Sequence, residues 1–353
     1  MNKLTVLVAM LATLLSAQDA KHPAFHETNH AKAPAGLTAY KPAKGISGQL
    51  RSVGADTMEA ITKNWLEGFA KLYPDVKFTM EAKASGTAGP ALVDGTADIG
   101  PVAREMLPNE VEPFVKKYGY KPYAIRVAGG SYRTPGKTHA IAFLVNAKNP
   151  IDKLTYAQVD AMFSSTRKRG HADIKTWGDV GLKGEWADKP IHLWGLIRPN
   201  GIANFVQERV LSVRSDPDDK ELGEYKSPIS ERTTVGSLPA LDAIARGVAG
   251  DPYAIGYSGF SNVTPEIKAV ALSIGDKGPF YKGTFEEVAE QKYPLSRVIY
   301  IYLNRAPGKP LDPKIKEFLK YVLSKEGQAV VEQEGVFLPL PLEFVKQELK
   351  KLE

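Results

Sequence analysis

The 353-residue sequence contains no cysteine. A chain without thiols cannot form a disulfide framework, a thiolate nucleophile, an iron–sulfur cluster or a thiolate zinc site, and it cannot carry a lipid on cysteine. Aromatic residues are scarce at 9%, beside 43% hydrophobic and 24% charged residues. This composition excludes a membrane-embedded bundle and a disordered chain. The length is sufficient for two domains with hydrophobic cores.

Acidic residues are slightly outnumbered: 40 Asp and Glu stand against 46 Lys and Arg, which gives a net charge of +6. A mild excess of positive charge suits an anionic partner, but it does not determine the fold. The charge balance is therefore compatible with an anionic partner of any kind.

The first 20 residues have the pattern of a signal peptide. One early lysine is followed by an uncharged apolar run and then by small residues, in MNKLTVLVAMLATLLSA. The run is too short to span a bilayer well. We expect cleavage within residues 17–20 and a soluble periplasmic or secreted protein, without a lipid anchor.

Residues 21–45 are rich in Lys, His, Pro and Ala and predict a flexible linker. His22, His26 and His30 are spaced by four, so a helix would align them on one face, where they could hold a divalent metal. The prolines of the segment and its lack of an apolar stripe argue against such a helix. We therefore predict a solvated linker and no metal site.

From residue 49 onward, short apolar runs alternate with segments of helical periodicity. Strands are predicted at 50–53, 76–82, 98–101, 139–146, 192–197, 254–258 and 298–304. Helices are predicted at 57–72, 90–94, 155–163, from 201, and at 237–248, 313–324 and 344–352. Asp56 and Glu59 resemble a capping box. The alternation indicates a mostly parallel α/β fold with more units than one sheet usually holds, hence two lobes with a ligand cleft.

Three loops of small residues each follow a predicted strand and precede a predicted helix. They are Gly54-Ala55-Asp56-Thr57, Ser85-Gly86-Thr87-Ala88-Gly89 and Arg198-Pro199-Asn200-Gly201. Free N–H groups and the dipole of a helix start attract an anion, and Ser and Thr hydroxyls add donors. Arg104 and Arg198 stand beside two of these loops and would add charge. One such loop is ordinarily a helix cap, but three together indicate an oxyanion site.

Longer stretches carry a family resemblance. GADTMEAITKNWLEGFAKLYP and SGTAGPALVDGTADIGPVAREM, with later echoes such as YPLSRVIYIYLNRAPGKPL, resemble the phosphate-binding component of bacterial phosphate ABC transporters over residues 49–342. The resemblance implies a two-lobed periplasmic-binding-protein type II fold with two crossover strands and an inter-lobe cleft that closes on a dehydrated oxyanion. We expect lobe I at 46–146, lobe II at 147–258 and a return to lobe I at 259–353.

The predicted site departs from the pattern of that family. Ala55 replaces a hydroxyl residue of the first loop, and Ala103 stands where the family has Ser or Asp before the retained Arg104. Each charge-assisted hydrogen bond lost from a buried site costs about 1.5–3 kcal/mol, roughly ten- to a hundredfold in affinity.

The third loop departs furthest. Aligned on Gly201, Ile202 takes the place of a family Thr, and Leu196 takes the place of the family Arg. Arg198 then lies two residues late. Backbone N–H groups survive such changes, so anion binding can persist while its selectivity changes.

The resulting prediction is a non-enzymatic, exported binding protein for phosphate or a related oxyanion. It would be a monomer that serves an inner-membrane ABC permease, with no cofactor, no catalytic residue and no nucleic-acid partner. The expected ligand-binding residues are Asp56, Thr57, Ser85, Gly86, Thr87, Arg104, Arg198, Asn200 and Gly201. Asp56 would accept the proton of HPO₄²⁻, which sulfate lacks; alternatively it only caps its helix.

Two other function classes stay open. A member with a degenerate site could act as an interaction protein, or the site could take sulfate, molybdate or arsenate. A phosphoester hydrolase has the least support, since no metal-ligand cluster or activated nucleophile is visible.

Other motifs are set aside. Residues 130–138 nearly spell a Walker A loop, but Ser131 replaces its first glycine, and the segment leads into a strand. The basic run 167–169 is interpreted as a solvated loop. His139, His171 and His192 are scattered and are interpreted as packing residues.

Overall fold

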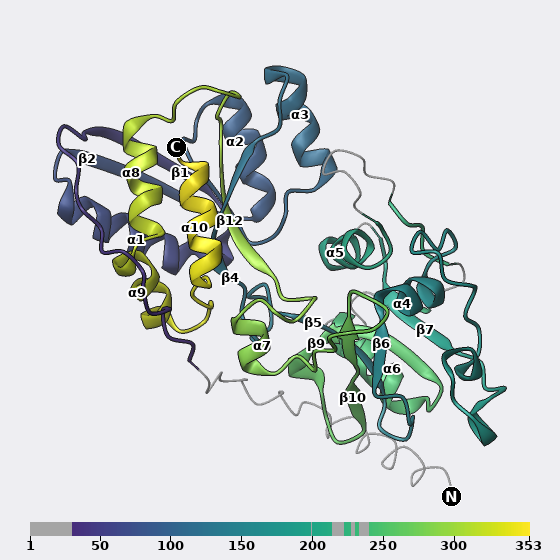
Figure 1. Ribbon diagram of the computed structural model, residues 1–353. Helices are drawn as coiled ribbons and strands as arrows, with labels where there is room; N and C mark the ends of the chain where they lie inside the picture. The colour runs from purple at the N-terminus through teal and green to yellow at the C-terminus, as the bar shows by residue number, and fades with distance from the viewer. Residues whose placement is uncertain (1–29, 199, 214–221, 227–229, 233–239) are drawn as a thin grey trace, which may run out of the picture.

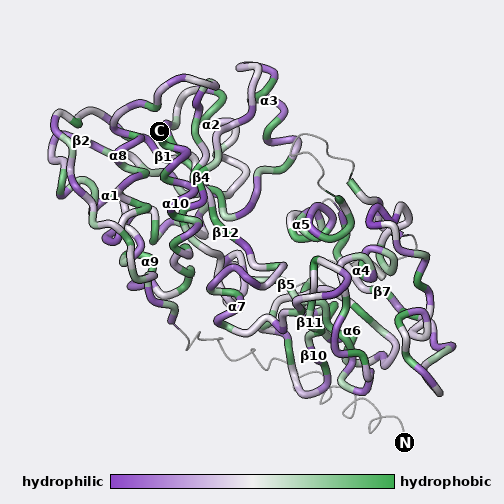
Figure 2. Tube along the Cα trace, in the orientation of Figure 1, coloured by the Kyte–Doolittle hydropathy of each residue, from purple (hydrophilic) through white to green (hydrophobic). Residues whose placement is uncertain are grey.

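The computed structural model describes residues 30–198, 200–213, 222–226, 230–232 and 240–353. Two lobes lie side by side, joined by extended segments between them, with the C-terminus in the first lobe (Figure 1). Each lobe has its own buried core, around Trp65 and Phe318 in the first and around Trp177 and Phe143 in the second. Figure 2 shows hydrophobic residues gathered along the central strands of both lobes.

Lobe I is built on five strands of the described chain. Its strands are β1 (Gly48–Gly54), β2 (Val76–Ala82), β3 (Gly100–Val102), β4 (Tyr123–Gly129) and β12 (Val298–Leu303). β1 pairs with β2 in parallel, and a parallel bridge between Ser52 and Ile99 joins β1 to the start of β3. β12 lies between β3 and β4 and is antiparallel to both.

Six helices of the described chain cover this sheet. They are α1 (Glu59–Leu72), α2 (Ala88–Asp94), α3 (Pro108–Tyr118), α8 (Pro313–Val322), α9 (Lys325–Glu334) and α10 (Leu342–Lys351). Short 3₁₀ turns, η1 (Asp56–Met58) and η2 (Ser85–Thr87), precede α1 and α2. Both turns start directly after a strand, so they bring the first two predicted loops to the carboxyl ends of β1 and β2.

Lobe II contains a five-stranded sheet, in the order β10-β5-β9-β7-β8. Its strands are β5 (Ile141–Asn146), β7 (His192–Leu196), β8 (Ser230–Arg232), β9 (Ala254–Gly259) and β10 (Ile267–Ala269), and β6 (Lys153–Thr155) pairs with β11 (Ala271–Ser273) beside it. Its helices are α4 (Tyr156–Phe163), α5 (Gly201–Arg209), α6 (Ala240–Gly250) and α7 (Phe285–Ala289), with 3₁₀ turns η3 (Trp177–Val180), η4 (Gly184–Trp186) and η5 (Phe260–Asn262).

The chain crosses from lobe I to lobe II between β4 and β5 and returns before β12. β5 is antiparallel to β9 and β10, just as β12 is antiparallel to its neighbours, because each crossover strand enters its sheet from the other lobe. The sheets are therefore mixed rather than mostly parallel. Since β5 belongs to the lobe II sheet, we place the two boundaries between the lobes near residues 130–140 and 290–297. The sequence predicted them after residues 146 and 258.

The seven predicted strands are all present, with ends displaced by no more than a few residues. The predicted capping box of α1 is wrong. Asp56 accepts the N–H of the adjacent Thr57 at 2.8 Å, and Ala55 is the residue before the turn. The elements that were not predicted are the helices α3, α7 and α9 and the strands β4, β6, β8, β10 and β11. The proposed serine cap at 237 lies outside the described residues.

The described part of the predicted linker, residues 30–45, is held against lobe I, so the prediction of a flexible segment is wrong there. Leu37 is buried, and the backbone N–H of Tyr40 donates to Glu326 at 2.7 Å. The Tyr40 hydroxyl donates to Glu317 at 2.7 Å. The composition of residues 30–45 predicted flexibility, but a few side chains that contact lobe I are enough to hold this Pro-rich segment in place.

The predicted signal peptide, His22 and His26 lie outside the described residues. His30 is exposed and lies beside Gly335 at the end of α9. Within the described ranges, no helix is both long and apolar enough to cross a membrane.

Candidate functional site

A cavity of about 300 Å³ opens between the lobes at the level of the crossover segments. Its lining comes from the helix starts of lobe I, the start of α5 in lobe II and both crossovers. The lining residues are Thr57, Ser85, Ala103, Arg104, Gly136, Thr138, His139, Asn200, Gly201, Ile202 and Arg297. Residues separated by up to 240 positions in the sequence thus meet at one place.

The lobe I wall offers hydroxyl donors. The Ser85 hydroxyl accepts the N–H of Ala103 at 3.3 Å, which leaves its own proton for another acceptor. The Thr57 hydroxyl oxygen is buried and has no hydrogen-bond partner. A buried polar group without a partner is costly unless a ligand or water satisfies it. Both hydroxyls are therefore suited to bind an anion.

Arg104 stands on the same wall with its guanidinium fixed. It donates from both terminal nitrogens to the two oxygens of Glu110, each at 2.7 Å. Burial alone would raise the pKa of Glu110, but hydrogen bonds from Arg104 and from the N–H of Leu107 hold it below its usual value. The aliphatic part of Arg104 packs close to Gly201 across the cleft. This arginine therefore shapes the wall, with much of its charge balanced by Glu110.

The lobe II wall is the start of α5. Asn200 caps this helix, and its side-chain oxygen accepts the N–H groups of Ile202 at 2.8 Å and Ala203 at 3.3 Å. The side-chain NH₂ of Asn200 and the N–H of Gly201 remain as donors for a ligand, in the positive end of the helix dipole. Figure 1 shows α5 on the side of lobe II that faces α3.

The far end of α5 is held by Arg169. Its side chain donates to three backbone carbonyls, those of Val210 at 2.5 Å, Arg209 at 2.9 Å and Ser212 at 2.8 Å. A cation at a helix C-terminus is favourable both for the dipole and for the unpaired carbonyls. The prediction of a solvated basic run is therefore wrong for this residue, which anchors the helix whose start lines the cavity.

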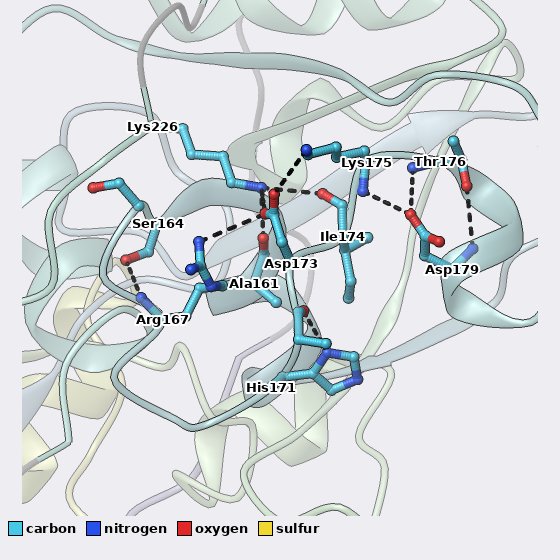
Figure 3. Close-up of polar contacts among 12 residues, drawn as sticks. Ala161, Ser164, Arg167, His171, Asp173, Ile174, Lys175, Thr176, Asp179 and Lys226 are labelled. Atoms are coloured by element: carbon cyan, nitrogen blue, oxygen red, sulfur yellow. Dashed lines mark hydrogen bonds and ion pairs between the residues drawn. The ribbon is translucent and has the colours of Figure 1, made fainter.

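The neighbouring charges of that loop pair with one another. Figure 3 shows Asp173 facing Lys226 and Arg167, with distances between charged atoms of 2.5 and 3.8 Å. The ring of His171 contacts only the adjacent carbonyl of Ala172 in that view. These residues stabilise the outer part of lobe II and do not line the cavity.

Arg297 forms the floor of the cavity, and the sequence analysis missed it. Only 8% of this residue is exposed, its Nε has no hydrogen-bond partner, and its guanidinium lies 5.1 Å from the centre of the Phe205 ring. Burial lowers the pKa of Arg297, and nearby Arg104 lowers it further, against the opposing effect of Glu105. The sequence contained a signal for this residue. An arginine directly before the apolar strand β12 is not expected there unless it has a partner.

Thr138 and His139, in the first crossover, complete the floor. Thr138 has φ +53°, unusual for a β-branched residue, and its hydroxyl donates to the Ala103 carbonyl at 2.6 Å. His139 is 5% exposed, and burial together with the charge of Arg297 lowers its pKa to about 4. Both lie in or beside the segment that the sequence analysis set aside as a near match to Walker A.

Five of the nine predicted ligand-binding residues line the cavity. These are Thr57, Ser85, Arg104, Asn200 and Gly201. Gly86 lies behind the wall, where an added Cβ would come within 3.0 Å of Glu110.

The other three are directed elsewhere. Thr87 turns its hydroxyl back onto the carbonyl of Ala84 at 2.7 Å. Asp56 is exposed and Arg198 stacks on Tyr225 at 4.8 Å, and neither is among the lining residues. Neighbouring backbone groups engage Thr87 and Asp56, and an aromatic ring engages Arg198.

Comparisons with known proteins agree with this architecture. A family model described as a PBP superfamily domain matches residues 39–326. The phosphate-binding protein PstS of Pseudomonas aeruginosa is 40% identical over 317 residues, which cover 90% of each chain. The chain belongs to the PstS family. PstS of Staphylococcus saprophyticus is more distant, at 26% identity over 87% of this chain and 85% of its own.

Solved structures of PstS-family and related proteins share the fold. The PstS crystal structure from Borrelia burgdorferi matches with a TM-score of 0.54 at 16% identity, over 84% of this chain and 100% of its own. An ABC-type phosphate transport receptor from Vibrio cholerae matches with a TM-score of 0.51 at 18% identity, over 82% and 99%. The prediction of a two-lobed periplasmic-binding-protein fold is confirmed.

Proposed function

We propose that this protein captures phosphate or a related tetrahedral oxyanion in the cavity between its lobes and delivers it to an ABC importer. One observation carries the proposal: the buried cation of Arg297 faces the same cavity as the hydroxyls of Thr57 and Ser85 and the start of α5. Membership of the PstS family supports the same ligand class.

Physical chemistry explains why this arrangement suits a small anion. The guanidinium of Arg297 is already removed from water, so its attraction for an anion is weakly screened. Hydroxyl and amide donors from both walls can replace the hydration shell of the anion. Because Asn200 and Gly201 belong to lobe II and Ser85 to lobe I, a ligand that touches both walls would stabilise the closed arrangement.

The remaining parts of the proposal follow from the family. The protein would bind and release its ligand without catalysing a reaction, act as a monomer in the periplasm after removal of residues 1–20, and present its closed form to an inner-membrane permease. It would need neither a cofactor nor a nucleic-acid partner.

Titration calorimetry with phosphate, sulfate, arsenate and molybdate tests the function. We expect saturable binding of phosphate and of arsenate, which has the same shape and protonation, and no heat with acetate as a planar control anion. No heat with any of the four oxyanions would contradict the proposal.

A further inference from the structure

The chemistry of the lining raises a question about selectivity that rests on the proposed function. Within the described chain, no Asp or Glu is among the residues that line the cavity. Phosphate at neutral pH carries a proton that sulfate lacks, so a site that prefers phosphate needs a group that accepts a hydrogen bond. Asp56, the acceptor expected from the sequence, is exposed and is not part of the lining.

Most lining groups cannot be that acceptor. Arg104 and Arg297 only donate. The Asn200 oxygen already accepts two backbone N–H groups. The Ser85 oxygen accepts one, and the hydroxyls of Ser85 and Thr57 carry protons that suit them first as donors to an anion. The proton of Thr138 is committed to the Ala103 carbonyl, so its oxygen can only assist as a secondary acceptor.

His139 has the properties that the role requires. Its ring is 5% exposed, lines the cavity, and has no hydrogen-bond partner at either nitrogen. The pKa of about 4 keeps the imidazole neutral at neutral pH, with one N–H and one lone pair. Since neither nitrogen is committed to a protein partner, one can carry the proton while the other accepts a hydrogen bond.

The surroundings hold this ring in place. Gly259 lies against it so closely that an added Cβ would come within 2.4 Å of the ring carbon Cδ2. The preceding residue, Thr138, is held in its left-handed conformation by the hydrogen bond to Ala103. The charged group that faces the ring is Arg297, which disfavours a second positive charge. Backbone strain at Thr138 and exclusion of positive charge at the adjacent His139 are both typical of functional positions.

We infer that His139 recognises the protonated oxygen of the bound anion. Its imidazole accepts a hydrogen bond from the P–OH group and so favours hydrogen phosphate over sulfate. Sulfate would place an unprotonated oxygen against the same lone pair. A neutral acceptor also avoids the repulsion that a carboxylate would exert on the dianion. His139 is then a specificity-determining residue in direct contact with the ligand.

Calorimetry at neutral pH on the full mature chain tests this role, with His139→Phe, His139→Gln and the matched surface control His171→Phe. We expect His139→Phe to lower phosphate affinity about 10- to 100-fold and to change sulfate affinity less than about threefold. His139→Gln, which keeps an acceptor, should retain most of the preference, and His171→Phe all of it. A wild-type phosphate-to-sulfate ratio in His139→Phe would overturn the inference while leaving the proposed function intact.

Nitrogen NMR of the wild-type protein gives a second readout, in which a variant is needed only to assign the resonance. The resonance of the unprotonated His139 nitrogen, assigned by its absence from His139→Gln, should shift on addition of phosphate and not on addition of sulfate. An unchanged resonance at phosphate saturation would overturn the inference. A wild-type protein that binds no phosphate at all would overturn both this inference and the proposed function.

Discussion

The two walls of the cleft differ in what they offer an anion. Lobe I presents the hydroxyls of Thr57 and Ser85, and Arg297 lies at the floor where β12 enters that lobe. Lobe II presents the amide of Asn200, the N–H of Gly201 and the apolar side chain of Ile202. The comparison leads to the hypothesis that lobe I and the floor supply most of the contacts to the proposed anion, whereas lobe II mainly covers it.

Among the residues that the structure describes, the lobe II wall offers few hydrogen-bond donors and no charged side chain to an anion, for a structural reason. Asn200 consumes two of the N–H groups at the start of α5 as a helix cap. Leu196, which aligns with the family arginine, is 3% exposed and packs in the lobe II core. The charge that this wall lacks is supplied at the floor by Arg297.

The largest effect is expected from removing the floor charge. Arg297→Met should lower phosphate affinity by at least about a hundredfold, because a buried, charge-assisted interaction with the anion is lost. Arg198→Met is the matched control and should change affinity less than about twofold, since Arg198 is exposed. Calorimetry on both variants checks this, and equal losses would contradict the assignment of the floor.

A smaller effect is expected from the lobe I wall. Ser85→Ala removes a neutral donor to the anion and should lower phosphate affinity about tenfold. Thr87→Ala, in the same turn, removes a hydroxyl that bonds to Ala84 and should leave affinity nearly unchanged. A larger loss of phosphate affinity in the Thr87 variant than in the Ser85 variant would contradict the assignment of Ser85, rather than Thr87, to the cavity wall.

The lobe II wall should matter less for affinity than for stability. Asn200→Ala removes the α5 cap, which costs about 1 kcal/mol of stability, but it also frees two N–H groups for the anion. We expect a loss of about threefold or less in phosphate affinity, measured by calorimetry, with a lower melting temperature. Asn200→Asp keeps the cap, so it should restore stability yet bind phosphate more weakly than the Ala variant.

The smallest effect concerns Asp56. Asp56→Asn should change the ratio of phosphate to sulfate affinity less than about twofold, because this carboxylate is exposed and does not line the cavity. Competition binding with the two anions measures the ratio. A collapse of selectivity in this variant would restore the acceptor role that the sequence suggested and would weaken the case for His139.

Sequence reasoning predicted most of what depends on local pattern. The seven predicted strands and the helix starts after β1 and β2 follow from periodicity and from residues adjacent in the chain. Asn200, which was predicted as a ligand donor, also caps α5. The roles proposed for Arg297 and His139 could not be predicted from local pattern. Each residue acquires its neighbours only when the two crossover segments come together in the fold. The role of Asp56 as a ligand acceptor stays a prediction; in the structure its carboxylate accepts the neighbouring N–H of Thr57.

The central claim is the position of the anion, and arsenate makes it directly measurable because arsenic scatters anomalously. A crystal of the protein soaked with arsenate should show one anomalous peak between the lobes, within hydrogen-bond distance of the Ser85 hydroxyl and the Arg297 guanidinium. A peak beside Asp56 or Arg198 instead, or a cavity without any peak at saturating arsenate, would contradict the account.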